Sequence, residues 1–217
     1  MTEQDFNALK SRTVTVLFQV GKCYETGDGV GKDEAEAVKW YRMAAERGSA
    51  EAMFELSKCY TFGIGVRRNR ITASKWLHKA AKQGHARAMV LLGKRCLDYD
   101  SGEYNSRKAV SLFRNAAEQG DAWGMFHLGE CYINGDGVKK DFDTAYLWFY
   151  KAVVTAPEDE HLYQSVQHEI FDPNLKECRD NMLKEALNQS NQEMCNPTIC
   201  ISNQPQFEGE RGNDIPG

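Results

Sequence analysis

The sequence predicts an all-α protein, a right-handed α–α solenoid in which helix pairs stack one on the next. Three segments with similar endings, AERG, AKQG and AEQG, close at Gly48, Gly84 and Gly120, 36 residues apart. The same step aligns the tetrapeptides GKCY, SKCY, GKRC and GECY, which begin at Gly21, Ser57, Gly93 and Gly129. It also aligns Trp40, Trp76, Leu112 and Trp148. Self-similarity at a period of 20–50 residues is typical of stacked supersecondary units.

One unit is predicted to consist of two helices joined by a glycine loop. Residues 52–60 carry small or apolar side chains spaced as one stripe of a helix. The glycines of the following GIGV segment, 63–66, permit the positive φ of a helix C-cap and a chain reversal. Residues 73–81 then form the stripe of a second helix, which ends at Gly84 and places Trp76 in the core.

The starts of the second helices and the spacing within each pair are also predicted. Good N-cap residues precede each second helix, namely Asp33, Asn69, Asn105 and Asp141. Asp33 and Glu36 resemble a capping box. Gly21, Ser57, Gly93 and Gly129 are small enough to let the first helix approach its partner closely.

The period divides the chain into segments. We expect four units at 13–48, 49–84, 85–120 and 121–156, with residues 1–12 extending the first helix so that Phe6 and Leu9 cover the N-terminal end of the stack. Residues 157–190 are expected to form a degenerate pair of capping helices. The composition of 191–217 predicts a disordered tail.

These residues form a pattern that is similar to the Sel1-like repeat, a relative of the tetratricopeptide repeat with a longer loop between its helices. The first unit carries it as Val20, Gly21, Tyr24, Gly27, Gly29, Val30, Trp40, Ala44, Ala45 and Gly48, and the fourth repeats most of it between Leu128 and Trp148. The third unit departs from the pattern, with Tyr99-Asp100-Ser101-Gly102 in the loop and Leu112 in place of tryptophan. The resemblance implies a scaffold for protein–protein interaction that needs no cofactor.

Composition narrows the compartment and the chemistry. No apolar run approaches the roughly 18 residues of a membrane span, and the N-terminus lacks a basic signal segment, so we expect a cytoplasmic protein. Cys23, Cys59 and Cys131 occupy one position of different units, about 10 Å apart in stacked helices, too far for disulfides. Cys195 and Cys200 could form a bridge or bind a metal, but two ligands without a nearby histidine do not predict a zinc site.

No catalytic constellation is recognised in the sequence. His161 and His168 could share a helix face, but no nucleophile stands in a suitable spacing to them. The glycine loops lack the Lys-Ser/Thr pair of a phosphate-binding loop. The resemblance raises an enzyme alternative, because some cysteine-rich relatives are described as binding or hydrolysing β-lactams. Their second cysteine in each unit and a Ser-x-x-Lys set are absent here, which disfavours that alternative.

The face of each first helix opposite its core stripe is the predicted partner-binding surface, because in tetratricopeptide-like stacks it lines the concave side. A projection at about 100° per residue places there an apolar row with charged neighbours: Phe18, Phe54, Val90 and Phe126, with Lys22, Lys58, Lys94, Trp123 and Glu130. Apolar side chains on a free face indicate a binding groove. The alternative is that neighbouring first helices bury this row, in which case the basic face around Arg67 to Arg70 is the next candidate.

A strongly basic segment lies in the second and third units. Between Glu55 and Asp98 there are ten basic residues and no acidic one, which leaves 17 basic and 31 acidic residues elsewhere. The predicted basic patch comprises Arg67, Arg68, Arg70, Lys75, Lys79 and Lys82. Such a block can meet an acidic partner, a nucleic acid or the chain's own acidic end, although a pI near 5.8 disfavours nucleic acid. We therefore predict a monomeric, non-catalytic adaptor for another protein with a partly acidic segment.

Overall fold

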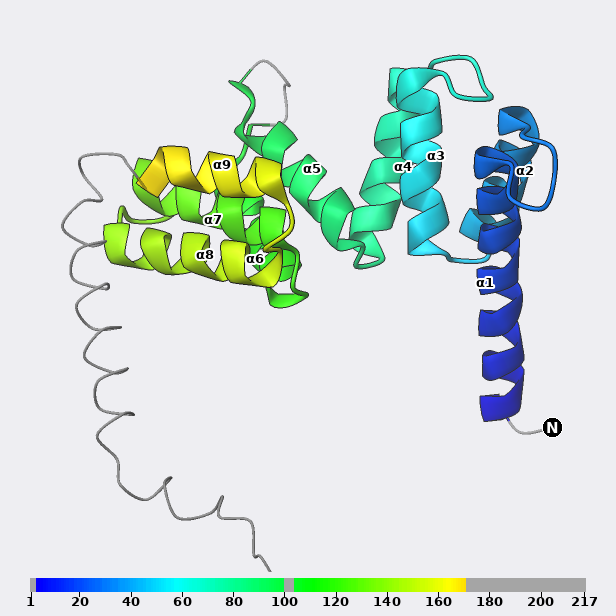
Figure 1. The fold of residues 1–217 in the computed structure, drawn as a ribbon, viewed down its shortest axis with the longest axis horizontal. Coiled ribbons are helices and arrows are strands. Elements are labelled where there is room, and N and C mark those ends of the chain that lie inside the picture. Colours follow the sequence, from blue (N-terminus) through cyan, green and yellow to red (C-terminus); the bar gives the residue numbers. More distant parts are fainter. Residues whose placement is uncertain (1–2, 100–103, 171–217) are drawn as a thin grey trace, which may run out of the picture. The chain divides into compact units, whose positions relative to one another are not determined.

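The computed structural model describes residues 3–99 and 104–170, with only the backbone for residues 3–12 and 170. The predicted tail, the second capping helix, Cys195 and Cys200 lie outside these ranges. The described residues form only helices, which confirms an all-α solenoid (Figure 1). The helices are α1 Glu3–Thr26, α2 Glu34–Glu46, α3 Ala50–Phe62, α4 Arg70–Lys82, α5 Ala86–Leu97, α6 Ser106–Glu118, α7 Ala122–Asn134, α8 Phe142–Thr155 and α9 Glu160–Ile170.

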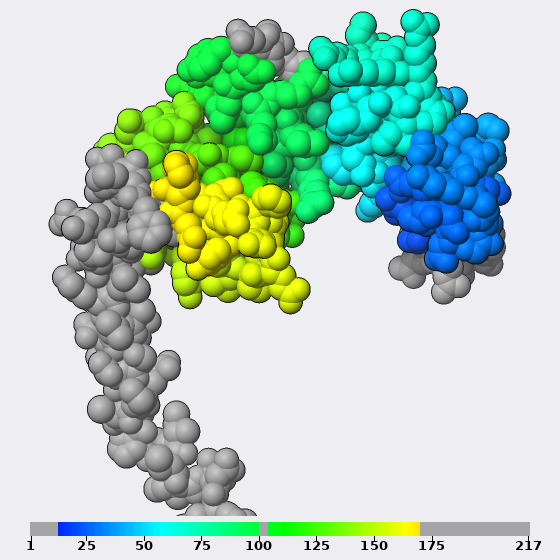
Figure 2. All heavy atoms as spheres, turned by 45° about the horizontal axis from the view of Figure 1, so that its top comes forward, coloured from blue at the N-terminus to red at the C-terminus, as the bar shows by residue number. Residues whose placement is uncertain are grey.

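The helices pack as four consecutive pairs. Within each pair the first helix packs along the second, as α3 does on α4 and α5 on α6. Each second helix also contacts the first helix of the next pair, so that α2 meets α3, α4 meets α5 and α6 meets α7. The ninth helix, α9, lies against α7 and α8, as the space-filling view shows (Figure 2).

The predicted N-caps are confirmed. Asp33, Asn69, Asn105 and Asp141 each accept a hydrogen bond from the backbone N–H three residues further on. The capping box at Asp33 is half formed, because the Glu36 carboxylate pairs with Lys39 at 2.7 Å. The first helices have caps at the same period, namely Ser49, His85 and Asp121.

Glycine on the first helix allows the close approach within each pair. A Cβ atom on Gly21, Gly93 or Gly129 would lie 2.5–2.7 Å from an aromatic ring of the second helix. The rings belong to Tyr41, Phe113 and Phe149, which are fully buried. The second repeat has Ser57 in place of the glycine and Leu77 in place of the aromatic residue. The larger residue on its first helix thus faces a smaller residue on its second helix.

In two of the loops, glycine allows the backbone to approach the preceding repeat closely. A Cβ atom on Gly65 would lie 2.1 Å from the carbonyl oxygen of Glu34, at the start of α2. The corresponding distance from Gly137 to the carbonyl oxygen of Ser106, at the start of α6, is 2.5 Å. The equivalent residue of the third repeat, Ser101, lies outside the described residues. These loops are therefore structural turns that support the stack.

The prediction that the aligned tryptophans occupy the core is wrong. The fully buried position is the next residue, as in Tyr41, Phe113 and Phe149, whereas Trp76 and Trp148 are only partly buried. The Nζ atom of Lys79 lies 4.4 Å from the centre of the Trp76 ring, and that of Lys151 lies 4.6 Å from the Trp148 ring. Neighbouring positions are about 100° apart around a helix. Trp76 and Trp148 thus lie at the edge of the buried stripe, packed against the core and with a lysine ammonium over each ring.

Candidate functional site

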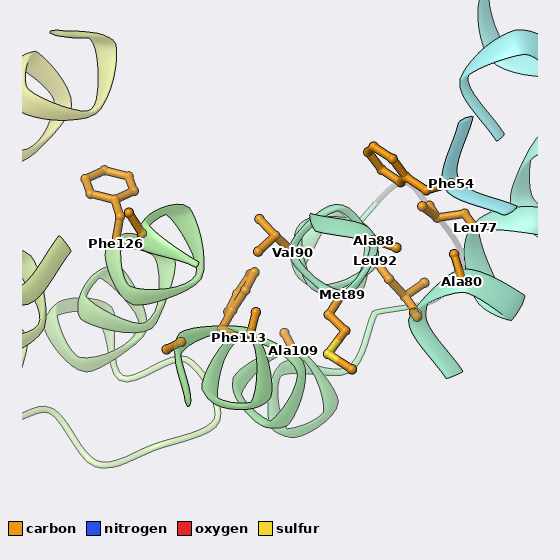
Figure 3. Close-up of a cluster of buried hydrophobic side chains, with 14 of the residues drawn as sticks. Phe54, Leu77, Ala80, Ala88, Met89, Val90, Leu92, Ala109, Phe113 and Phe126 are labelled. Carbon is orange, nitrogen blue, oxygen red and sulfur yellow. The ribbon is translucent and has the colours of Figure 1, made fainter. Parts of the chain in front are cut away.

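Most of the apolar row that the sequence placed on a free face is buried. Phe54, Val90 and Phe126 expose 9%, 5% and 5% of their surface, so the prediction that they are exposed is wrong. These residues lie on α3, α5 and α7, three successive first helices (Figure 3). Phe18 is half-buried, with its ring centroid 5.7 Å from that of Tyr41. Packing between repeats therefore buries most of this row, which was the alternative to a free binding face.

His85 explains why Phe54 is covered. The imidazole is the N-cap of α5, and its Nδ1 atom accepts a hydrogen bond of 3.2 Å from the backbone N–H of Ala88. This bond fixes the ring over Phe54, at a centroid distance of 4.4 Å and a tilt of 20°. Burial lowers the pKa of His85, so its neutral form is favoured in the folded chain. From the sequence alone, His85 is recognisable only as the residue aligned with Ser49 and Asp121, and its contact with Phe54 is not.

Several charges beside the row are paired. The buried Glu55 carboxylate lies 3.2 Å from Nζ of Lys22 and 2.5 Å from Nζ of Lys58, which links the first two repeats. Lys22 also pairs with Glu25 at 2.7 Å. In the fourth repeat Glu130 lies 2.5 Å from Nδ1 of His127. The exposed side chain of Lys94 has no ion-pair partner in the part of the chain that the structure describes.

A groove of about 420 Å³ remains beside the buried row, and we call it the inner groove. Its apolar lining comes from Phe54, Val90, Leu91 and Trp123, and Arg87 and Lys94 contribute basic groups. Asp121 and His127 complete it. Leu91 exposes 43% of its surface, so it is the row's neighbour, rather than the row itself, that meets solvent.

The orientation of Trp123 in the inner groove is set by α9. The indole N–H donates a hydrogen bond of 3.0 Å to Oδ2 of Asp159. The other carboxylate oxygen accepts from the backbone N–H of Leu162 at 3.0 Å, and so caps α9. The Leu162 N–H and the Trp123 indole together hold the pKa of Asp159 below its usual value. Sequence reasoning missed Asp159, although an aspartate just before a predicted helix was a usable signal.

The structure distributes the predicted basic patch over several surfaces. All six of its residues are exposed. Lys75 and Lys79 lie beside Trp76 in one depression, and Lys79 and Lys82 line another, between the first two repeats. Arg70 also lines the first of these depressions, and with Arg68 it lines a groove between the second and third repeats.

This second groove, which we call the basic groove, has a volume of about 560 Å³. Its cationic lining is Lys58, Arg68, Arg70, Lys94 and Arg95. The buried residues Ser57, Ala73 and Leu77 also line it, together with the exposed apolar side chains of Phe62 and Leu91. Leu91 and Lys94 line the inner groove as well, so the two grooves adjoin along α5.

The described cysteines form no disulfide, and two of them are buried thiols with raised pKa values. Cys23, Cys59, Cys96 and Cys131 form no disulfide, and the last three are buried. Burial raises the pKa of Cys59 to about 11 and that of Cys131 to about 12. Both thiols are therefore protonated near neutral pH, which disfavours nucleophilic and metal-binding roles.

None of the helices within 3–99 and 104–170 has both the length and the apolar character that crossing a membrane requires.

Comparison with known families gives a match along most of the helical region. The model of the family described as "Sel1 repeat" matches residues 16–49, 50–85, 86–121 and 124–153, which together make up more than half of the chain. The chain belongs to the Sel1 repeat family. Proteins with Sel1 repeats generally act as scaffolds for protein–protein interaction and are typically non-catalytic.

Solved structures similar to this Sel1 repeat protein include a Sel1 repeat protein from Oxalobacter formigenes. The two share 34% identity with a TM-score of 0.60, over 69% of this chain and 61% of the other. This chain thus spans less than two thirds of that relative's length.

More distant likenesses include a protective antigen of uropathogenic Escherichia coli that displays an SLR fold. That match has 17% identity and a TM-score of 0.27, over 93% of this chain and 66% of the other. Another is the immunity protein Pa5087 from Pseudomonas aeruginosa, with 19% identity and a TM-score of 0.39 over 66% of each chain. A comparison with curated protein sequences gives no significant match.

Proposed function

We propose that this Sel1 repeat protein is a non-catalytic, monomeric adaptor of the cytoplasm that binds a segment of another protein in the inner groove. The observation that supports the proposal is the lining of this groove, where apolar side chains from three successive repeats lie beside Lys94, a cation without an ion-pair partner among the described residues. Aromatic and apolar anchors next to a few charges are typical of the residues that dominate binding energy at interfaces. The four described cysteines form no disulfide, which fits a reducing compartment.

The proposed contact residues differ in part from the row expected from the sequence. Leu91, Trp123, Arg87 and Lys94 would touch the partner, since they line the groove and each is at least partly exposed. Phe54 and Val90 would form its buried wall. We propose no direct contact for Phe126, because it is buried and lies outside the lining.

The proposal can be tested by affinity capture with the full-length chain from an extract of its native source. Each protein identified by mass spectrometry would be purified and titrated against the unchanged chain and against Leu91→Ser. The variant should weaken binding by about tenfold or more, because an exposed apolar contact is lost without loss of a core residue.

Val154→Ser is the matched control, since Val154 exposes 59% of its surface on α8 and lines neither groove. It should leave the dissociation constant unchanged. Equal affinity of the Leu91→Ser protein and the unchanged chain, with helical content intact, would refute the inner groove as the binding site.

The two alternatives raised by the sequence find less support. Binding or hydrolysis of β-lactams would need a nucleophile or a polar pocket, whereas the inner groove is mainly apolar and the buried thiols of Cys59 and Cys131 are protonated. Nucleic acid would be held by cationic side chains along its backbone. The depressions lined by the basic patch adjoin through Arg70 and Lys79, but the one between the first two repeats is also lined by the carboxylate of Glu46.

A further inference from the structure

We propose that the basic groove binds an acidic, apolar-containing peptide segment, which continues from the partner segment held in the inner groove. The inference rests on the proposed function, because it names the chemistry of the same protein partner. Lys22 is paired with Glu25 and Glu55, so we do not assign it to binding the acidic segment. The acidic segment is instead expected to bind residues that the packing of α3, α4 and α5 brings together.

The first argument is charge. Among the residues that the structure describes, five basic side chains and no acidic one line the groove. Lys58 is partly neutralised by Glu55 at 2.5 Å, and Arg95 donates a hydrogen bond of 3.0 Å to Oγ of Ser74. Arg68, Arg70 and Lys94 have no ion-pair partner within the described segments. Uncompensated cations in a concave surface attract carboxylates and speed their encounter.

The second argument is the apolar part of the lining. Ala73 and Leu77 are buried, and Phe62 and Leu91 expose 70% and 43% of their surfaces. A simple anion would leave these apolar groups in water. An extended peptide presents successive side chains to opposite sides. It can therefore direct carboxylates to the arginines and an apolar side chain to Leu77 and Leu91.

The third argument is continuity between the two grooves. Leu91 and Lys94 line both of them, so a segment that leaves the inner groove passes α5 directly into the basic groove. The packing between repeats leaves space for a bound segment beside α5. The first helices α5 and α7 pack directly against each other, whereas α3 and α5 approach each other less closely. One bound chain can thus use apolar contacts on one side of Leu91 and charged contacts on the other.

A protein segment suits this surface better than a nucleic acid does. Single-stranded nucleic acids are held along a cationic track about 4–16 nucleotides long. The route out of the basic groove past Lys94 leads to the carboxylate of Asp121 in the inner groove. The route past Arg70 leads through the depression beside Trp76 to the carboxylate of Glu46. Outside residues 56–97 the chain has 17 basic and 31 acidic residues, which would repel a longer phosphate backbone.

The test uses the full-length chain and a fluorescent peptide of alternating glutamate and leucine, long enough to span both grooves. A matched peptide carries glutamine in place of glutamate, and a single-stranded oligonucleotide of equal charge is the third probe. The protein variants are Arg68→Glu with Arg70→Glu, and the control pair Lys75→Glu with Lys82→Glu. The control residues are also exposed and change the net charge equally, but they line no part of the basic groove.

We expect the acidic peptide to bind the unchanged chain, with anisotropy as the readout. Replacement of glutamate by glutamine, and the Arg68→Glu with Arg70→Glu pair, should each weaken binding by about tenfold, whereas the control pair should stay within about twofold. Phe62→Ala should also weaken binding without loss of helical content, because Phe62 is exposed.

Three results would overturn the inference. An equal loss with both charge-reversed pairs would mean general attraction between charges rather than a site. Tighter binding of the oligonucleotide that is lost in the Arg68→Glu with Arg70→Glu protein would make nucleic acid the occupant. Light scattering could show that the unchanged chain is a dimer and that the Arg68→Glu with Arg70→Glu protein is a monomer. The occupant of the basic groove would then be a second copy of this chain.

The captured partner separates this inference from the proposed function. If its binding depends on Leu91 but not on Arg68 or Arg70, the adaptor function stands and the acidic segment is refuted. If it depends on none of these residues, both proposals fail.

Discussion

The pairing of Gly93 on α5 with Phe113 on α6 gives a prediction whose size follows from the structure. A Cβ atom on Gly93 would lie 2.5, 2.9 and 3.0 Å from three ring carbons of Phe113. The ring is fully buried and cannot turn into solvent. Gly93→Ser therefore has to push the ring, and α6 with it, away from α5.

The expected cost is about 1–2 kcal/mol of unfolding free energy. Carbon contacts are optimal near about 3.5–4.0 Å, so the new atom is about 1 Å too close. Overpacking of this kind costs about 1–3 kcal/mol. The better helix propensity of serine returns up to about 0.5 kcal/mol. The new hydroxyl can donate to the carbonyl of Val90, just as the Ser57 hydroxyl donates to that of Phe54 at 2.7 Å.

The second repeat indicates which change should rescue this variant. It has Ser57 and Leu77 where the third repeat has Gly93 and Phe113. Phe113→Leu alone leaves a void and should cost about 1–2 kcal/mol. Combined with Gly93→Ser it should cost clearly less than the sum of the two single changes, with a coupling of about 1–2 kcal/mol, because the two residues are in contact.

Thermal and urea unfolding followed by circular dichroism would measure these terms. In a chain of this size about 1 kcal/mol shifts the thermal midpoint by about 2–4 °C. Gly31→Ala is the control, because nothing among the described residues lies within 4 Å of a Cβ there, and it should not lower the midpoint. Additive costs in the double variant, or a Gly93→Ser protein as stable as the unchanged one, would refute the close α5–α6 contact.

Two further predictions concern titratable groups. Because burial lowers the pKa of His85, the stability it contributes is present above the ordinary histidine pKa of about 6.5 and is lost as the pH falls through its lowered folded value. The melting temperature should therefore drop less steeply below about pH 6.5 in His85→Asn, which keeps a capping side chain; parallel curves would contradict this. Cys59 and Cys131 should remain unmodified when the native chain is treated with a maleimide near neutral pH, since both are buried with raised pKa values; rapid labelling in peptide maps would show that the repeats open readily.

Local features of the fold were predictable because they depend on residues close together in the sequence. The caps Asp33, Asn69, Asn105 and Asp141 act on a backbone N–H three residues away, so each can be recognised without the rest of the chain. The close approach at Gly93 was likewise predicted from the small residue repeated in every unit. The core position of the tryptophans was mispredicted, because a shift of one residue around a helix is decided by the neighbouring repeat.

The candidate site was less predictable, because it depends on contacts between repeats. The apolar row on the first helices was recognised, but whether it was exposed depended on how closely the next helix lies. His85 covers Phe54 only because the cap of α5 falls beside α3. In the same way Lys22 is paired because Glu55 of the next repeat lies 3.2 Å from its Nζ atom. The pairing of Lys58 with Glu55 lies within one helix, where a spacing of three residues was a usable signal.

The sequence by itself determined the 36-residue period, the all-α repeat architecture, the helix caps and the excess of positive charge between Glu55 and Asp98. The tertiary structure alone decided which parts of that pattern remain accessible. It buried Phe54, Val90 and Phe126, left Leu91 and Lys94 exposed between two grooves, and spread the basic patch over adjoining depressions. The physical reason is that a period specifies the geometry within one unit, whereas exposure is set by the packing between units, where side chains 30 or more residues apart compete for the same space.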